Sequence, residues 1–233
     1  MNTIHDNLLA IRNEIETIAS KCKRDPNTIE LIAVSKTKPV QQITEAISAG
    51  QFSFGENYVQ EGIEKIQYFK KTMSSQLLTW HFIGPLQSNK SKLVAENFDW
   101  MHTIDRFKIA QRLNDQRPTS MAKLNVLIQV NISQEASKSG VAPEEVAGLV
   151  KQIIALPNLN LRGLMAIPEI EDDFGKQLNV FTKMQKLLHS LQADYPFMDT
   201  LSMGMSSDMQ AAIVAGSTMV RIGTAIFGAR QYL

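Results

Sequence analysis

Residues 29–39 read I-E-L-I-A-V-S-K-T-K-P, a short apolar run with an abrupt polar end. An apolar run of this length is typical of a buried strand, and Pro39 prevents the strand from continuing. Lys36 therefore lies where a buried strand ends. An amine in partly dry surroundings gives up its proton more readily and can attack an aldehyde carbon. We expect a chemical role for Lys36, against the alternative of an ordinary solvated lysine.

Short apolar runs of this kind recur along the chain. The eight strand candidates are 31–34, 52–55, 79–84, 100–104, 125–132, 161–167, 200–203 and 219–222. Between them, apolar residues at helical spacing predict helices over 40–49, 143–156 and 174–191. Asp105 is the expected cap of a further helix, and a long helix over about 4–20 precedes the first strand.

Eight strands separated by helices predict an α/β fold, a (β/α)8 barrel of the TIM type with an extra N-terminal helix. At 233 residues the chain leaves room for one domain, 1–233. The alternative is an open doubly wound sheet. However, neither G-x-G-x-x-G nor G-x-x-x-x-G-K-[ST] follows any strand, so the usual nucleotide-binding motifs of such sheets are missing.

Composition excludes several classes of function. The net charge is +1, so no strong field draws the chain to nucleic acid or to an acidic membrane surface. Cys22 is the single cysteine, so an internal disulfide is ruled out. The sequence contains neither H-E-x-x-H nor C-x-x-C, so no motif indicates a metal site. The N-terminus has no signal-peptide pattern, and no apolar stretch approaches the ~20 residues that span a bilayer. We expect a cytoplasmic protein.

The carboxyl ends of the strands are where such a barrel places its chemistry. The stretch 202–211 reads S-M-G-M-S-S-D-M-Q-A, with Ser206 or Ser207 as the expected helix cap and anion site. The last strand ends in R-I-G-T, where Gly223 allows close backbone approach and Thr224 adds a hydroxyl. Barrels often bind phosphate between the loops after strands seven and eight, so a phosphorylated ligand is favoured over plain capping.

Arg221 alternates with Val220 and Ile222 on the last strand. If Val220 faces the helices, Arg221 points into the barrel, where its charge needs a ligand or a buried acidic partner. A strand-end lysine, a phosphate site and an inward arginine together describe a pocket for pyridoxal 5′-phosphate (PLP). The lysine would form an imine with the aldehyde, and the arginine would donate to the ring nitrogen.

Five motifs in order resemble the family of pyridoxal phosphate homeostasis proteins. They are A-V-S-K-T-K-P, F-G-E-N-Y-V-Q-E, W-H-F-I-G-P-L-Q-S-N-K, L-S-M-G-M-S-S-D-M and V-R-I-G-T-A-I-F-G-A-R. The match runs essentially end to end. It implies a fold like the barrel half of alanine racemase-type, fold-type III enzymes.

The resemblance implies roles for individual residues. Lys36 would carry the internal aldimine, and Arg221 would meet the pyridine nitrogen. Asn57 and Met165 fall in strand-end motifs expected to line the cofactor cavity. The phosphate would be held by Ser206, Gly223 and Thr224. Lys138, in S-K-S-G-V, also matches a family loop, but the resemblance gives it no clear role.

The leading functional hypothesis is a non-enzymatic PLP carrier that limits free aldehyde, with apo-enzymes that use PLP as candidate recipients. An arginine beside the pyridine nitrogen keeps that nitrogen unprotonated and makes the ring a weaker electron sink. The chain also stops at Leu233 without the second domain of the racemases, which removes their usual dimer contact, so we expect a monomer. The alternatives are a racemase-like PLP enzyme and an aldolase that uses Lys36 directly.

Overall fold

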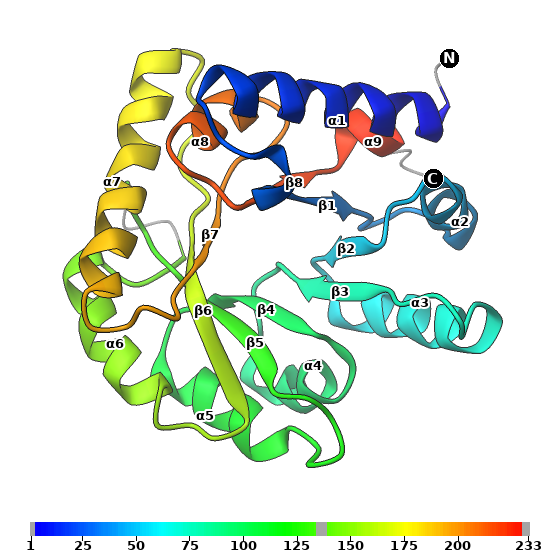
Figure 1. Cartoon of the computed structure of the whole chain (residues 1–233). Helices are drawn as coiled ribbons and strands as arrows, with labels where there is room; N and C mark the ends of the chain where they lie inside the picture. The colour runs from blue at the N-terminus through cyan, green and yellow to red at the C-terminus, as the bar shows by residue number, and fades with distance from the viewer. Residues whose placement is uncertain (1–2, 134–138, 230–233) are drawn as a thin grey trace.

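The computed structural model describes residues 3–133 and 139–229. Its centre is a closed barrel in which each strand runs parallel to the next and β8 returns to β1 (Figure 1). The strands are β1 (Glu30–Val34), β2 (Ser53–Glu56), β3 (Thr79–Phe82), β4 (Trp100–Ile104), β5 (Leu124–Gln129), β6 (Leu159–Met165), β7 (Thr200–Ser202) and β8 (Met219–Ile222). The predicted (β/α)8 barrel is therefore confirmed.

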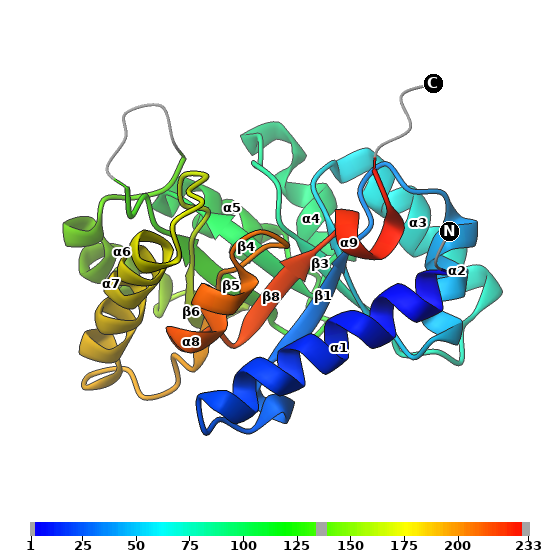
Figure 2. The ribbon, with the colours of Figure 1, turned by 90° about the horizontal axis from the view of Figure 1, so that it is seen from above.

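Helices form the outer layer around these strands (Figures 1 and 2). They are α1 (Ile4–Lys21), α2 (Val40–Ser48), α3 (Val59–Thr72), α4 (Ser91–Asn97), α5 (Phe107–Gln116), α6 (Val146–Ile153), α7 (Phe174–Gln192), α8 (Met209–Val214) and α9 (Thr224–Phe227). Helix α1 is the extra N-terminal helix. It begins with a capping box between Thr3 and Asp6 and contacts α2, α8 and α9.

Alternation along the strands divides the apolar side chains into two cores. Odd and even positions of a strand face opposite sides, so Leu31 and Ala33 pack under the helices while Ile32 points into the barrel. The small interior cluster consists of Ile32, Trp100, Leu127, Met165 and Met219. The larger cluster lies between the barrel and the helices and includes Phe54, Trp80 and Val220.

Several predicted boundaries need correction. Strand β5 ends at Gln129 rather than 132, because Val130 forms an isolated bridge with Val141 and the chain leaves the β5–β6 ladder. The helix predicted over 143–156 is a 3-10 turn, Pro143–Glu145, followed by α6.

Asp105 does not cap α5, since Arg106 holds that position without a side-chain bond and the Asp105 carboxylate accepts from Arg106 Nη1 instead. Asp105 is a suitable capping residue by type, but its carboxylate pairs with Arg106 instead of with the backbone of α5.

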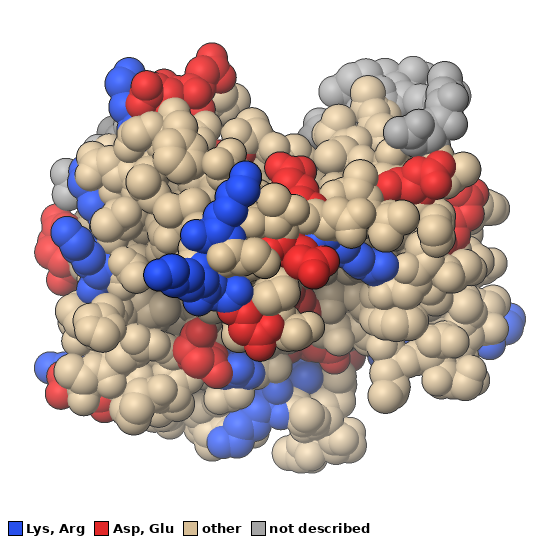
Figure 3. All heavy atoms as spheres, turned by 45° about the horizontal axis from the view of Figure 1, so that its top comes forward, with Lys and Arg blue, Asp and Glu red and all other residues tan. Residues whose placement is uncertain are grey.

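Lys, Arg, Asp and Glu side chains share the face of the molecule that Figure 3 shows. On the face in Figure 3, acidic and basic side chains are interspersed, as a net charge of +1 allows. Within residues 3–133 and 139–229, no helix is both long enough and apolar enough to cross a bilayer.

Candidate functional site

The end of β1 places Lys36 between two neighbouring strands. Ile32 lies opposite Arg221 of β8, and Val34 lies opposite Gly55 of β2. The Ser35 amide donates to the Gly55 carbonyl at 3.0 Å, so the sheet pairing extends to the residue before Lys36. Lys36 itself is half-buried. It therefore lies at the carboxyl end of the barrel, flanked by the segments that follow β8 and β2.

The segments after β6, β7 and β8 meet on the other side of Lys36. The Arg221 amide donates to the Gly204 carbonyl at 2.9 Å, which joins the end of β8 to the loop that carries Ser206. Met165 lies opposite Ser202 at the end of β6. All seven predicted site residues thus come from the ends of five consecutive strands, β6, β7, β8, β1 and β2.

Gly223 is the first residue after β8, and its backbone lies close to the end of β1. A Cβ added to Gly223 would lie 3.3 Å from the Val34 carbonyl and from Val34 Cβ. The small residue therefore lets Thr224, which is exposed at the mouth, approach the segment that carries Lys36. Helix α9 is anchored from outside, since Asn7 Nδ2 of α1 donates to the Ile226 carbonyl at 2.8 Å.

Arg221 is 4% exposed and points into the barrel, as its alternation with Val220 predicts. Its Nη1 donates to Ser202 Oγ at 2.7 Å, and its Nη2 donates to the Ala166 carbonyl at 3.0 Å. Burial lowers the pKa of Arg221 to about 10, and Asp208 partly offsets the loss, so the guanidinium stays charged at neutral pH. Within the described residues its hydrogen bonds go to a hydroxyl and a carbonyl rather than to a carboxylate.

A polar row continues below Arg221 through the barrel interior. Ser202 Oγ lies 3.0 Å from His102 Nδ1, and His102 Nε2 lies 3.0 Å from His81 Nδ1. Both rings are fully buried, and burial lowers the pKa of His81 to about 3 and that of His102 well below 6.5. The two histidines are therefore neutral and act as hydrogen-bonding groups that support Ser202 and, through it, Arg221.

His81, His102 and Ser202 are not among the residues that the sequence predicts for the site. Alternation was the available signal, because all three occupy interior positions of their strands, in step with Trp100 on β4 and Met219 beside β7. Met165, by contrast, is fully buried in the interior apolar cluster.

Asn57 has an unfilled acceptor at the mouth. Its Oδ1 is buried and has no hydrogen-bond partner among the described residues. The backbone there is held tightly, since a Cβ on Gly84 would lie 2.1 Å from the Asn57 carbonyl oxygen, and the Gly84 carbonyl accepts from Thr103 Oγ1 at 2.6 Å. A buried amide oxygen without a partner is rare in proteins, so this one fits a ligand that donates to it.

The loop after β7 differs from the predicted capped helix. Helix α8 begins at Met209, and Asp208 precedes it and accepts from the Met205 amide. Ser206 and Ser207 are thus not helix caps, because a turn separates them from the helix and Asp208 stabilises that turn. Both serines are exposed. An anion at this loop would meet hydroxyls and turn amides rather than a helix end.

Two other lysines near the mouth are held as structural groups. Lys38 Nζ donates to the carbonyls of Phe227, Gly228 and Ala229 at 3.0–3.1 Å. Lys65 Nζ donates to three acceptors and is 5% exposed. An ammonium group has three donors, and each of these lysines makes three such contacts. Lys138 lies outside the described residues.

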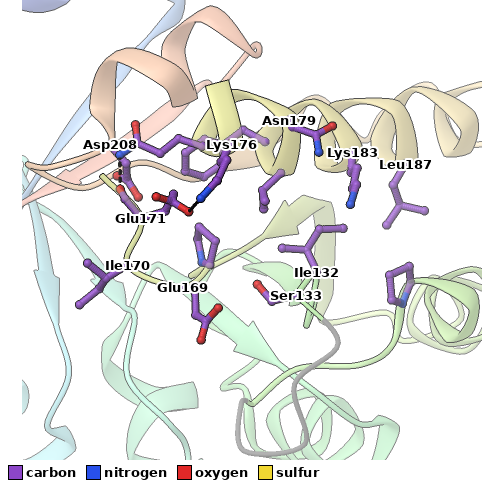
Figure 4. Close-up of a pocket in the computed structure, with 15 residues that line it drawn as sticks. Ile132, Ser133, Glu169, Ile170, Glu171, Lys176, Asn179, Lys183, Leu187 and Asp208 are labelled. Atoms are coloured by element: carbon purple, nitrogen blue, oxygen red, sulfur yellow. Dashed lines mark hydrogen bonds and ion pairs between the residues drawn. The ribbon is translucent and has the colours of Figure 1, made fainter. Parts of the chain in front are cut away.

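A cavity of about 600 Å³ lies beside this site, along α7 (Figure 4). Ile132, Ser133 and Glu169 line it from the loops after β5 and β6, and Asn179 and Lys183 line it from α7. None of the seven predicted residues lines it, and its link to the site is Asp208. Among the described residues, no three His, Cys, Asp or Glu side chains gather as a metal site.

Chemically, the site joins an amine at a strand end to a buried cation and to two exposed hydroxyls. Such a set fits a ligand with a carbonyl group, a ring acceptor and a phosphate. The unfilled oxygen of Asn57 and the close approach at Gly223 agree with a ligand seated across the barrel mouth.

Comparison with known proteins gives the family. The model of the alanine racemase N-terminal domain matches residues 7–231. Proteins named pyridoxal phosphate homeostasis protein are 60% identical in Vibrio alginolyticus and 59% identical in Escherichia coli K12, each over 232 residues. Those alignments cover 100% of this chain and 100% and 99% of the relatives.

Among solved structures, PipY of Synechococcus elongatus with PLP bound has a TM-score of 0.83 at 33% identity, covering 97% of this chain and 100% of PipY. The chain belongs to the alanine racemase N-terminal domain family and, within it, to the pyridoxal phosphate homeostasis proteins.

Proposed function

We propose that this chain binds PLP and serves in its homeostasis as a carrier without catalytic turnover. The observation that carries the proposal is the position of Lys36, half-buried at the end of β1 between the segments that hold Arg221 and Asn57. Relatives that cover the whole chain are named for PLP homeostasis, and a structure of PipY holds PLP. PLP brings an aldehyde that condenses with an amine.

Each proposed site residue has one task. Lys36 Nζ would bond to the aldehyde carbon, and Arg221 would donate to the ring nitrogen. Asn57 Oδ1 accepts a hydrogen bond from the ligand, and the fully buried side chain of Met165 closes the floor. At the phosphate, hydroxyls of Ser206 and Thr224 donate and Gly223 permits the close approach.

Arg221 also explains why a carrier is favoured over an enzyme. It remains a cation at neutral pH, and a cation beside the ring nitrogen disfavours protonation of that nitrogen. The unprotonated ring is a poor electron sink, so abstraction of an α-proton from an amino acid gains little from it. The neutral histidines below Arg221 offer no acid to reverse this.

The test of this function is α-proton exchange in heavy water. We expect the purified protein to retain PLP, while amino acids added to the loaded protein take up deuterium slowly and keep their configuration. Exchange and inversion at about 1 per second or faster, typical of enzymes, would contradict the carrier proposal and favour a racemase-like enzyme.

Transfer to apo-enzymes, a monomeric state and a cytoplasmic location complete the proposal. The exposed hydroxyls at the mouth support a ligand that can be released. Transfer is measured as activity regained by an apo-enzyme mixed with the loaded protein, compared with the same amount of free PLP. Light scattering during gel filtration measures the oligomeric state.

A further inference from the structure

A buried ionic cluster lies directly behind the turn that carries Lys36. Its centre is Lys65 of α3, the helix that packs against β2 (Figure 1). Lys65 Nζ donates to Glu56 Oε1 at 2.8 Å, to Glu61 Oε1 at 2.6 Å and to the Ser35 carbonyl at 2.7 Å. Three donors thus meet three acceptors, and Lys65 is fully used.

The cluster holds the chain on both sides of Lys36. On one side, Ser35 gives its carbonyl to Lys65, and its hydroxyl donates to Glu56 Oε1 at 2.6 Å. On the other side, the Thr37 amide donates to Glu61 Oε1 at 2.5 Å. One carboxylate therefore fixes the residue before Lys36, a second fixes the residue after it, and Lys65 joins the two.

The turn adopts a conformation that needs such support. Thr37 has φ +62°, in the left-handed region that β-branched residues rarely enter. A strained backbone of this kind persists only where its surroundings hold it, and it is found most often at functional sites. The bond from Thr37 to Glu61 supplies that hold.

Strand alternation connects this hold to the amine. Ser35 follows Ala33, which faces the helices, and its contact with Glu56 confirms that its side chain points outward. Lys36 follows Ile32 and Val34 in the alternation and so belongs to the side of the barrel axis. Fixing Ser35 outward and Thr37 in its turn sets the direction in which Lys36 leaves the backbone.

We propose that Lys65, Glu56 and Glu61 form a positioning unit that holds the Ser35–Thr37 turn so that Lys36 Nζ meets the aldehyde carbon of PLP. This inference rests on the proposed function. In the step concerned, the neutral amine adds to the carbonyl carbon and a C=N bond replaces C=O. Water leaves with the aldehyde oxygen and both amine hydrogens. The three positioning residues exchange no atoms or electrons.

Glu61 offers the cleanest variant, because its side chain is 28% exposed whereas Glu56 and Lys65 are almost fully buried. Removing Lys65 would leave Glu56 as an uncompensated buried charge, which is strongly destabilising. We therefore compare Glu61→Ala with Glu64→Ala, an exposed glutamate one position before Lys65 on the same helix. Glu61→Gln serves as the rescue, since it keeps an oxygen that can accept from the Thr37 amide.

Two ligands separate imine formation from binding. PLP reports the rate at which the visible absorption band appears. Pyridoxine 5′-phosphate has an alcohol in place of the aldehyde, so its affinity reports the ring and phosphate contacts alone. Because a displacement of about 1 Å can cost a reaction 100-fold, we expect Glu61→Ala to slow the band by about 10- to 100-fold. The affinity for pyridoxine 5′-phosphate should stay within about twofold, since no contact with ring or phosphate changes.

The controls sharpen the result. Glu64→Ala should match the wild-type rate, and Glu61→Gln should recover most of it. Ser35→Ala, which removes the hydroxyl bond to Glu56 but keeps the charges, should also slow the band while the melting temperature shows the protein to be folded.

Equal rates in wild type, Glu61→Ala and Ser35→Ala would overturn the positioning role, as would a parallel loss of pyridoxine 5′-phosphate affinity. Absence of the band in the wild-type protein would instead overturn the proposed function itself.

Discussion

Arg221 Nη1 donates a 2.7 Å hydrogen bond to Ser202 Oγ, and this contact joins the mouth of the barrel to its interior. The same hydroxyl lies 3.0 Å from His102 Nδ1. One serine therefore connects the cation proposed to face the ligand ring with a row of neutral histidines. The position of Arg221 depends on an interior network that has no contact with solvent.

Ser202→Ala should destabilise the fold. The substitution leaves a guanidinium donor and an imidazole nitrogen buried without their shared partner. We expect the free energy of unfolding to fall by about 1–3 kcal/mol, the range for a buried polar group left unsatisfied. Urea denaturation measures it, with Ser190→Ala on the exposed face of α7 as the control. An unchanged midpoint would show that the network contributes nothing.

Stability should decrease as the pH falls from about 7 to about 5, around the ordinary histidine pKa. Burial lowers the pKa of His81 to about 3 and that of His102 well below 6.5. The unfolded chain therefore binds more protons than the folded one in this range, which favours unfolding by up to about 1.4 kcal/mol per pH unit for each histidine. Glu56 has the opposite effect on stability. Burial raises its pKa, so as the pH falls the folded chain takes up this proton before the unfolded chain does, which favours folding.

His81→Gln tests this origin. The variant should flatten the decline in unfolding free energy with falling pH, whatever its stability at neutral pH. His189→Gln, at an exposed position of α7, should keep the wild-type slope. If both variants show the same slope as the wild type, protonation of the buried histidine does not cause the decline.

Loss of either hydroxyl at the proposed phosphate site should weaken retention of PLP. Ser206→Ala and Thr224→Val each remove one polar contact, which is expected to cost about 1–3 kcal/mol of binding free energy. Equilibrium dialysis measures it, with Ser207→Ala, the exposed neighbour, as the matched control. Pyridoxal should bind much more weakly than its phosphate. Equal affinity for the two would place the ligand elsewhere.

The fold was predictable because its signals are local. Short apolar runs and the breaks after them, such as Pro39 after β1, define strands without knowledge of their neighbours. The strand-end position of Lys36 follows from that break, and the inward position of Arg221 follows from its alternation with Val220 and Ile222. Both positions in the fold are confirmed, and the roles of the two residues toward PLP stay predictions.

The contacts that support those residues were not predictable in the same way. Ser202 and His102 are 100 residues apart in the chain, and only the closure of the barrel brings them together. In the sequence, nothing distinguishes Lys65 from other helix lysines, because its contact with the Ser35 carbonyl forms only when α3 packs against β2. The two wrong helix caps have a different cause. Asp105 and Ser206 are residue types that often cap helices, but α5 and α8 begin later in the chain, with Arg106 and Asp208 at the N-cap positions.

The central claim, that the chain holds PLP as an imine on Lys36, is tested most directly by borohydride reduction followed by peptide mapping. Reduction converts a C=N bond into a stable amine and marks the lysine that formed it. The account predicts a yellow protein whose visible band disappears on reduction, with the label on the peptide that contains Lys36, and no label in folded Lys36→Ala. A label on Lys38 or Lys138 alone, with Lys36 unmodified, would contradict it.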